Sequence, residues 1–165
     1  MKYSDAHPRV LGGPFIAGTP KLIQLQFQNG KLGVFHVDDG SDMTLLDARF
    51  AELAKIPTWV PKERPNITVN TAFAGSRGII TKAAIASAKI VGADWLPEEA
   101  IWFDVAKIEG FNGILGSSWL IAMGIDIHGP ELRLRCNGSV IPQIASSDLR
   151  GIRATLRDND PQRPL

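Results

Sequence analysis

The feature that most constrains the fold is a period-two pattern that ends in a turn signal near residue 30. From Ile23 to Gln28, apolar residues alternate with glutamines, which is typical of a half-buried β-strand. Asn29 and Gly30 follow, and this dipeptide is favoured in two-residue hairpin turns. We therefore expect a β-hairpin whose return strand runs from Lys31 to Val37.

Further short strand patterns follow along the chain, separated by residues that favour turns. Helix signals are restricted to two short segments, one beginning at a possible N-cap, Asp47, and one at residues 117–122. The other expected strands are Ile67–Thr71, Ile79–Ala83, Ala84–Val91, Ala100–Ala106, Ile125–His128, Leu132–Cys136 and Val140–Pro142. Many short strands with two short helices predict a mainly β domain.

The length of 165 residues fits one domain, and its 44% hydrophobic and 21% charged residues are ordinary for a globular protein. Prolines and glycines are dense in residues 1–20, so we expect an extended N-terminal arm there. Residues 21–145 form the predicted domain. Residues 146–165 are expected to be a C-terminal arm or a flexible tail.

Charge and cysteine content exclude several classes of function. A net charge of +1 gives no overall attraction to nucleic acid or to an anionic membrane, so we expect neither as a partner. Cys136 is the single cysteine, which excludes an intrachain disulfide, and no histidine has ligand partners at useful spacing, so no metal site is expected. The sequence has no signal peptide or membrane-spanning run, which favours a soluble, cytoplasmic protein.

The sharpest chemical feature is an acidic pair and a glycine directly after an apolar strand. Asp38, Asp39, Gly40, Ser41 and Asp42 follow Val37, so the strand would hold Asp38 rigidly. On its own, an Asp-Gly pair is most simply a turn. Two carboxyl groups that share a proton can act as base and acid, and a homodimer would bring two copies of Asp38 together.

These residues resemble the active-site loop of retropepsin-like aspartic proteases, in which an apolar residue precedes Asp, Thr or Ser, Gly, and Ala or Ser. The second signature of that family, two apolar residues between glycines before a short helix, is matched by Gly113, Ile114, Leu115 and Gly116. Between the two motifs, where the family carries its substrate-covering flap, lie Ala74, Gly75, Ser76, Arg77 and Gly78. Order and spacing agree over roughly residues 22–136.

The resemblance implies a closed β-barrel half-lobe, like those of the acid protease fold, that dimerises and hydrolyses peptide bonds of a polypeptide substrate. One Asp38 would deprotonate a water molecule, and the other would stabilise the developing oxyanion. No cofactor or metal is implied. Residues 74–78 would form the flap over the substrate, although a plain hairpin loop explains them equally well. Asp42 would either bind substrate backbone or a partner arginine, or face water.

Asp39 departs from the family pattern, which has Thr or Ser at this position. Two Asp39 carboxylates near a dimer axis would repel each other, which would weaken the dimer at neutral pH. The leading interpretation is an aspartic endopeptidase. The alternatives are a catalytically impaired module that uses the same groove to bind peptides or to dimerise, and a small β-barrel that binds unrelated ligands.

Overall fold

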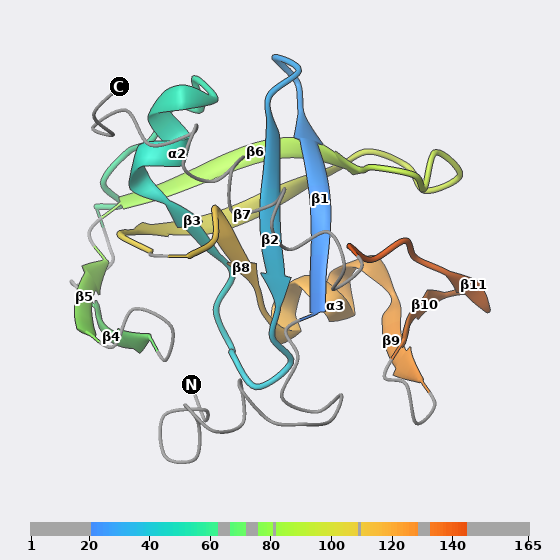
Figure 1. Cartoon of the computed structure of the whole chain (residues 1–165). Helices are drawn as coiled ribbons and strands as arrows, with labels where there is room; N and C mark the ends of the chain where they lie inside the picture. The colour runs from blue at the N-terminus through green and yellow to red at the C-terminus, as the bar shows by residue number, and fades with distance from the viewer. Residues whose placement is uncertain are drawn as a thin grey trace.

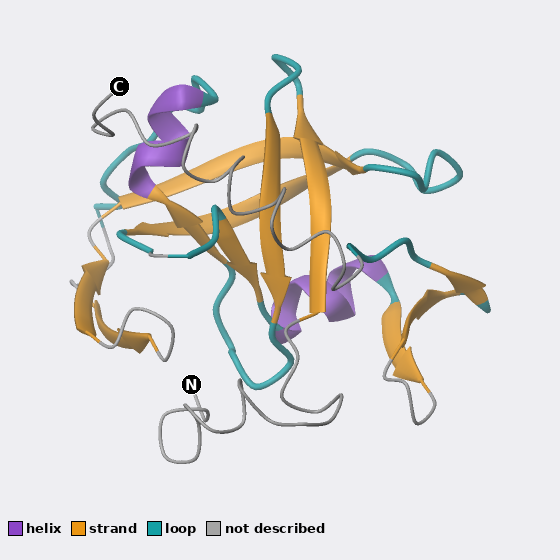
Figure 2. Ribbon diagram, viewed as in Figure 1, coloured by secondary structure: helices purple, strands orange, loops and turns teal. Residues whose placement is uncertain are grey.

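The computed structural model describes residues 21–62, 67–71, 76–80, 82–108, 110–128 and 133–144. The expected N-terminal arm and C-terminal tail lie outside these residues, as do Ala74 and Gly75 of the expected flap. The described part is mainly β with two short helices, as the sequence predicts (Figures 1 and 2).

A closed six-stranded barrel forms the body of the molecule, with strand order β1-β2-β8-β3-β7-β6 (Figure 1). Its strands, in chain order, are β1 (Lys21–Phe27), β2 (Leu32–Val37), β3 (Leu45–Asp47), β6 (Lys82–Ile90), β7 (Glu99–Ala106) and β8 (Gly113–Leu115). Two pairs are parallel, β2 with β8 and β3 with β7, and the other four are antiparallel. The parallel pairs position the candidate site, because they join segments far apart in the sequence.

Two smaller sheets lie outside the barrel. One is the hairpin of β4 (Ile67–Thr71) and β5 (Ser76–Ile80). The other has three strands, β9 (Ile125–His128), β10 (Arg133–Cys136) and β11 (Ser139–Val140). In the view of Figure 1 they lie on opposite sides of the loop that follows β2. Helix α2 (Ala48–Leu53) lies toward one end of the barrel and α3 (Ser117–Met123) toward the other (Figure 2).

The first hairpin is confirmed, but its loop has three residues instead of the predicted two. Phe27 N–H donates to Lys31 O at 2.9 Å, and Gly30 N–H donates to Phe27 O at 2.8 Å. Gly30 has φ of +89°, a left-handed conformation that favours glycine. A turn closed by such a residue is the usual three-residue hairpin loop, and it still keeps β1 and β2 in register.

Strand boundaries differ from expectation after the β4–β5 hairpin. The sequence predicts one strand over Ile79–Ala83, whereas β5 ends at Ile80 and β6 begins at Lys82. Thr81 and Lys82 interrupt the apolar residues at this boundary, but polar residues also occur within strands, so they give no clear sign that the chain leaves one sheet and enters another. The helix predictions are confirmed: Asp47 caps α2, accepting from Phe50 N–H at 3.1 Å, and α3 follows Gly116 directly.

Alternation along the strands separates two apolar clusters. Phe35, Val37, Leu46 and Leu115 point into the main core, where Phe35 meets Phe50 edge to face. Their neighbours along the strands therefore point to the opposite face. There Leu45, Ile114, Ala106 and Ile108 form a second, smaller buried cluster, with Met43 packed against it. Val37 points into the main core, so the next residue, Asp38, lies on the face of the second cluster.

Candidate active site

The two sequence motifs meet because β2 and β8 are parallel. Val37 pairs with Leu115, so the chain leaves both strands at the same end of the barrel. Asp38 N–H continues the ladder by donating to Leu115 O at 2.9 Å, and Ser117 N–H donates to Ser41 O at 2.7 Å. The Asp38 loop and the turn at Gly116 are thus joined by backbone hydrogen bonds.

Both glycines of the second motif are required by close packing. A Cβ atom on Gly116 would overlap the carbonyl oxygen of Met43 and lie 2.5 Å from that of Ser41. On Gly113 it would overlap the ring of Phe35 and lie 2.5 Å from Leu45 O. These glycines let β8 and its turn lie directly against the loop that carries Asp38. Ile114 and Leu115 between them face the second cluster and the main core, respectively.

Asp38 is a buried carboxyl group with one oxygen engaged and one available. Its side chain is 1% exposed, and Oδ1 accepts from Gly40 N–H at 2.9 Å. Oδ2 has no hydrogen-bond partner among the described residues. Burial raises the pKa of Asp38 and the charge of Asp39 adds to this, while the Gly40 hydrogen bond and Lys21 oppose it. Such a group is able to hold a proton at a pH where an exposed aspartate has lost it.

The other predicted loop residues have distinct positions. Asp39 and Asp42 are exposed, whereas Gly40 is half-buried and supplies the backbone donor to Asp38. Ser41 is buried, and its hydroxyl donates to Met43 O at 2.9 Å, so it closes the loop internally. Gly40 and Ser41 therefore shape the loop, and only the three aspartates bring charge to it.

Sequence reasoning missed two hydroxyl residues that hold the loop. Thr44 Oγ1 accepts from Gly116 N–H at 3.1 Å and lies 3.3 Å from Ser118 Oγ. Thr44 is 4% exposed, which is unusual for a polar side chain in a loop. The available signal was weak, since each residue stands just beyond one of the two motifs and is common in turns.

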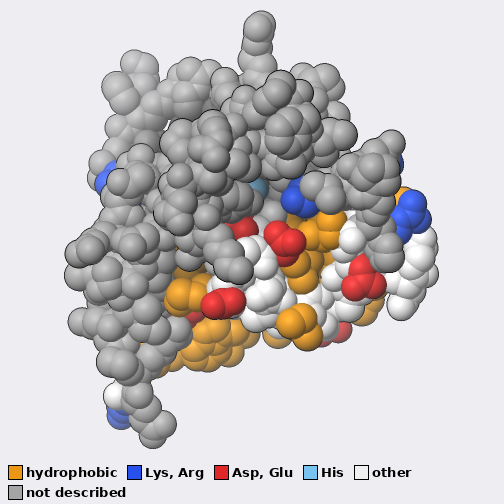
Figure 3. Space-filling model, turned by 90° about the horizontal axis from the view of Figure 1, so that it is seen from below, with side chains coloured by type: hydrophobic (Ala, Val, Ile, Leu, Met, Phe, Trp, Pro, Cys, Tyr) orange, Lys and Arg blue, Asp and Glu red, His pale blue; other side chains and the backbone are white. Residues whose placement is uncertain are grey.

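Apolar side chains surround the acidic loop. The second cluster, Leu45, Ala106, Ile108 and Ile114 with Met43, lies on the face whose parity Asp38 shares. Seen from below, acidic side chains lie among apolar ones at this end of the barrel (Figure 3). The site therefore combines a carboxyl group with a buried apolar cluster on the same face.

His36 lies on the same face of β2 as Asp38, two positions earlier. It is buried and stacks on Phe111, with ring centroids 5.4 Å apart. Burial lowers its pKa to about 3, and the charge of Lys21 acts in the same direction. His36 is therefore neutral over the ordinary pH range and contributes an aromatic surface instead of a charge.

The predicted flap corresponds in part to the β4–β5 hairpin. Ile67–Thr71 pairs antiparallel with Ser76–Ile80, and Thr71 is opposite Ser76. The sequence places Ser76, Arg77 and Gly78 at the tip, but they belong to β5, so the connection covers residues 72–75 only. Strand pairing explains this shift. The ladder between β4 and β5 runs from the pair Ile67–Ile80 to the pair Thr71–Ser76, so paired strand residues continue closer to the turn than the sequence indicates.

The described residues hold neither a metal cluster nor a membrane helix. No three His, Cys, Asp or Glu side chains in this part of the chain come close enough together to hold a metal ion. None of its helices combines the length and apolar character needed to cross a bilayer. Cys136 is a buried free thiol whose Sγ contacts Met123 O at 3.5 Å.

No family model and no curated protein matches the sequence. Among solved structures, the retroviral protease-like domain of Ddi1 from Leishmania major matches with a TM-score of 0.53 at 16% identity, covering 79% of this chain and 97% of that domain. A protein of unknown function from Legionella pneumophila matches with a TM-score of 0.32 at 14% identity, covering 61% of this chain and 83% of the other. On the first of these matches, the chain has a retropepsin-like fold.

Proposed function

We propose that this chain is an aspartic endopeptidase that works as a homodimer, with Asp38 of each copy at the catalytic centre. The observation that carries the proposal is the state of Asp38: a buried carboxyl group, rigidly placed by β2, with Oδ2 unengaged. One carboxyl per chain is not enough for acid–base catalysis on a peptide bond, so a second copy completes the site.

In the proposed mechanism the two Asp38 carboxyls share one proton. The ionised carboxylate removes a proton from a water molecule as that water attacks the scissile carbonyl carbon. The protonated carboxyl stabilises the oxyanion that forms and then supplies a proton to the leaving amine. The raised pKa of Asp38 supports this division of roles between a base and an acid. At a pH where exposed carboxyl groups have lost their protons, the pair can still hold one.

The outer edge of β9 is our candidate for the dimer contact. Leu134 O accepts from Ile141 N–H at 2.9 Å, and Leu134 N–H donates to Gln143 Oε1 at 3.1 Å, so both groups point away from β9. Ile127 is opposite Leu134 in the ladder, so its own N–H and C=O point away from β10. Within the described residues β9 pairs with β10 alone, which leaves these groups for a strand of a second copy.

An apolar substrate residue near the scissile bond would pack on Met43, the partly exposed residue that covers the second cluster. Leu45 and Ile114 belong to this cluster, on the face that Asp38 shares by parity, and the adjoining Met43 is half-buried. An apolar substrate side chain gains by leaving water there. The β4–β5 hairpin would cover the substrate backbone, with residues 74–78 forming the tip and the adjoining part of β5.

The test is cleavage of an unbiased peptide mixture by the purified full chain, from acid to neutral pH, with products identified by mass spectrometry. Asp38→Asn keeps the shape of the side chain and removes its proton chemistry, so cleavage should fall by at least about 100-fold. Asp94→Asn is the matched control, because it removes a carboxylate from an exposed turn outside the Asp38 loop and should leave cleavage unchanged. Equal cleavage by the parent and Asp38→Asn would contradict the proposal.

A second candidate is a peptide-binding module without catalysis, and Asp39 favours it. An exposed carboxylate stands where the resembling family has a hydroxyl residue. If the folded, dimeric parent cuts no peptide at any pH but retains peptides on a column, this second function is supported and the endopeptidase is not.

A further inference from the structure

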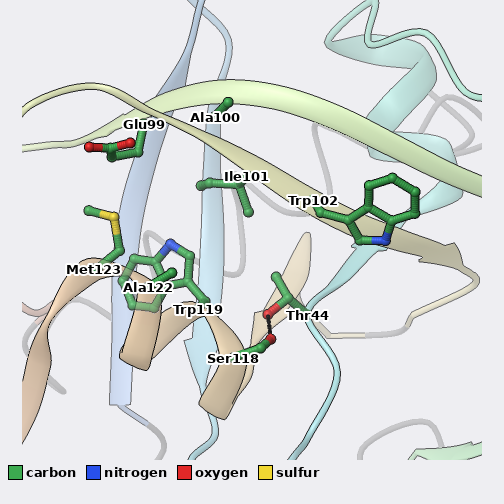
Figure 4. Close-up of a pocket in the computed structure, with 9 residues that line it drawn as sticks. All are labelled: Thr44, Glu99, Ala100, Ile101, Trp102, Ser118, Trp119, Ala122 and Met123. Carbon is green, nitrogen blue, oxygen red and sulfur yellow. Dashed lines mark hydrogen bonds between the residues drawn. The ribbon is translucent and has the colours of Figure 1, made fainter.

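A pocket that the proposed mechanism does not use lies between β7 and α3. Its volume is about 280 Å³. Ile101 and Trp102 of β7 line one side, and Ala122 and Met123 of α3 line the other (Figure 4). One water molecule occupies about 30 Å³ in the liquid, so a single water would not fill this space.

Trp119, which lines this pocket, carries a buried and unused hydrogen-bond donor. Its side chain is 4% exposed, and Nε1 has no acceptor among the described residues. The ring nitrogen lies on the edge of the indole that faces Ile101 (Figure 4). Buried indole N–H groups usually have a partner, because a buried donor without one is costly. An occupant that offers an acceptor would remove that cost.

Glu99 calls for a hydrogen-bond donor on the occupant, in addition to the acceptor that Trp119 calls for. This exposed residue lines the same pocket and belongs to β7, like Ile101 and Trp102 (Figure 4). Its negative charge disfavours an anionic occupant and favours one that carries an N–H donor. An amide satisfies both groups, with its C=O accepting from Trp119 and its N–H directed to Glu99.

The walls select what accompanies the amide. Trp102 and Ile101 present apolar surface, and Trp102 is 45% exposed, so covering it removes apolar area from water. Met123 is half-buried and has a flexible thioether side chain, which can move to admit a group to the edge of Trp119. An occupant with an apolar body and a neutral amide matches these walls, and the hydroxyls of Thr44 and Ser118, which also line the pocket, are compatible with an amide.

We propose that this pocket binds an apolar side chain of a polypeptide together with the adjoining peptide amide, at a place that includes Thr44 and Ser118, which hold the Asp38 loop, but not Asp38 itself. Such a contact would hold a partner or a substrate by a segment that is not being cut. The proposal does not depend on proteolysis, so a chain without peptidase activity could still confirm it.

The indole N–H signals in a ¹H–¹⁵N correlation spectrum provide a direct readout. The chain has four tryptophans, so four signals are expected, and Trp→Phe variants assign them. The probe is N-acetyl-L-leucinamide, titrated against the full chain. A ligand of about a dozen non-hydrogen atoms should bind with a millimolar Kd. The Trp119 and Trp102 signals should shift together and saturate, while the signal of exposed Trp95, outside the pocket, stays in place.

Two further probes separate a peptide site from a general amide pocket. The D enantiomer should bind at least about fivefold more weakly than the L enantiomer, because a polypeptide site recognises one hand. N-acetyl-L-leucine, which carries a carboxylate in place of the amide, should bind weakly to the parent and more tightly to Glu99→Gln. Equal binding of the enantiomers would overturn the assignment to a polypeptide.

Variants then test the donor. Trp119→Phe keeps an aromatic side chain, although a smaller one, and loses the N–H, so the saturating shift of Trp102 should need at least about fivefold more probe, whereas Trp95→Phe should change nothing. An unmoved Trp119 signal in the parent at probe concentrations well above the millimolar range would overturn the proposal, and that measurement needs no variant. Unchanged binding by a folded Trp119→Phe protein would also overturn it.

Discussion

Thr44 and Gly116, 72 positions apart, are joined by a hydrogen bond of 3.1 Å from the backbone N–H of Gly116 to Thr44 Oγ1. The bond links the loop after β2 to the turn after β8, and the neighbouring bond from Asp38 N–H to Leu115 O links them again. Because Gly116 cannot carry a side chain here, the threonine hydroxyl approaches its backbone directly. Asp38 is therefore held from both segments.

Removing the Thr44 hydroxyl should loosen this connection. Thr44→Val keeps the shape and leaves the buried Gly116 N–H without its acceptor, which we expect to cost about 1–3 kcal/mol of unfolding free energy. Peptide cleavage should fall as well, since the Asp38 loop loses one of its anchors. Urea unfolding and cleavage rates are the measurements. Thr44→Ser retains the hydroxyl and should stay within about 1 kcal/mol of the parent, and equal destabilisation by both variants would contradict this role.

Local features of the fold were predictable from sequence, whereas long-range pairings were not. Asp47 as the N-cap of α2 follows from its side-chain chemistry, and the β1–β2 hairpin follows from the alternation before Asn29 and Gly30. The hairpin loop was misjudged because Gly30 alone, and not the pair, takes the left-handed conformation. The parallel pairing of β2 with β8 has no local signal, and the order and spacing of the two motifs do not by themselves show that they meet.

The candidate site shows the same division. The residue type and strand position of Asp38 singled it out, and the structure adds its burial and its unengaged Oδ2. Thr44 and Ser118 were missed because their role arises only when two distant segments touch. The boundary between β5 and β6 was missed because the two polar residues there, Thr81 and Lys82, are also compatible with a continuous strand.

The raised pKa of Asp38 predicts how stability depends on pH. Above its ordinary pKa of 3.8, the unfolded chain has lost the proton while the folded chain still holds it. The unfolded state then binds fewer protons, so the unfolding free energy falls as pH rises through this range. Asp38→Asn removes this pH-dependent loss of unfolding free energy. We expect it to be more stable than the parent at neutral pH, with a difference that shrinks as the pH falls toward 3.8.

Urea unfolding of the parent and of Asp38→Asn at acid and neutral pH measures this effect. Asp94→Asn, in an exposed turn, controls for the loss of a carboxylate from the surface. Asp47, whose pKa burial also raises, is present in every protein compared and so cancels from the difference. A constant stability difference between the parent and Asp38→Asn across this pH range would show that Asp38 titrates as an exposed aspartate does.

Asp39→Thr should strengthen the proposed dimer. Asp39 is exposed beside Asp38, so two copies of the loop that meet at a dimer axis would bring two carboxylates together. Threonine removes both charges and supplies a hydroxyl that can donate across the axis. We expect the dimer dissociation constant at neutral pH to fall several-fold, as measured by sedimentation equilibrium. Added salt should narrow the difference between variant and parent, because it screens repulsion between exposed charges. No change in dissociation would place Asp39 away from the dimer axis.

Ile127→Pro tests whether the edge of β9 forms that dimer. The N–H of Ile127 points away from β10, so proline there removes no hydrogen bond of the β9–β10 ladder, and edge strands tolerate such a residue. The expected product is a folded monomer with a Tm within a few degrees of the parent and no peptidase activity. Asp126→Pro is the matched contrast, because Asp126 N–H faces Arg135 of β10, and loss of that ladder hydrogen bond should destabilise the fold itself by about 1–3 kcal/mol. If Ile127→Pro remains dimeric and active, the two copies meet through another surface, and the case for a shared Asp38 pair must then rest on that surface.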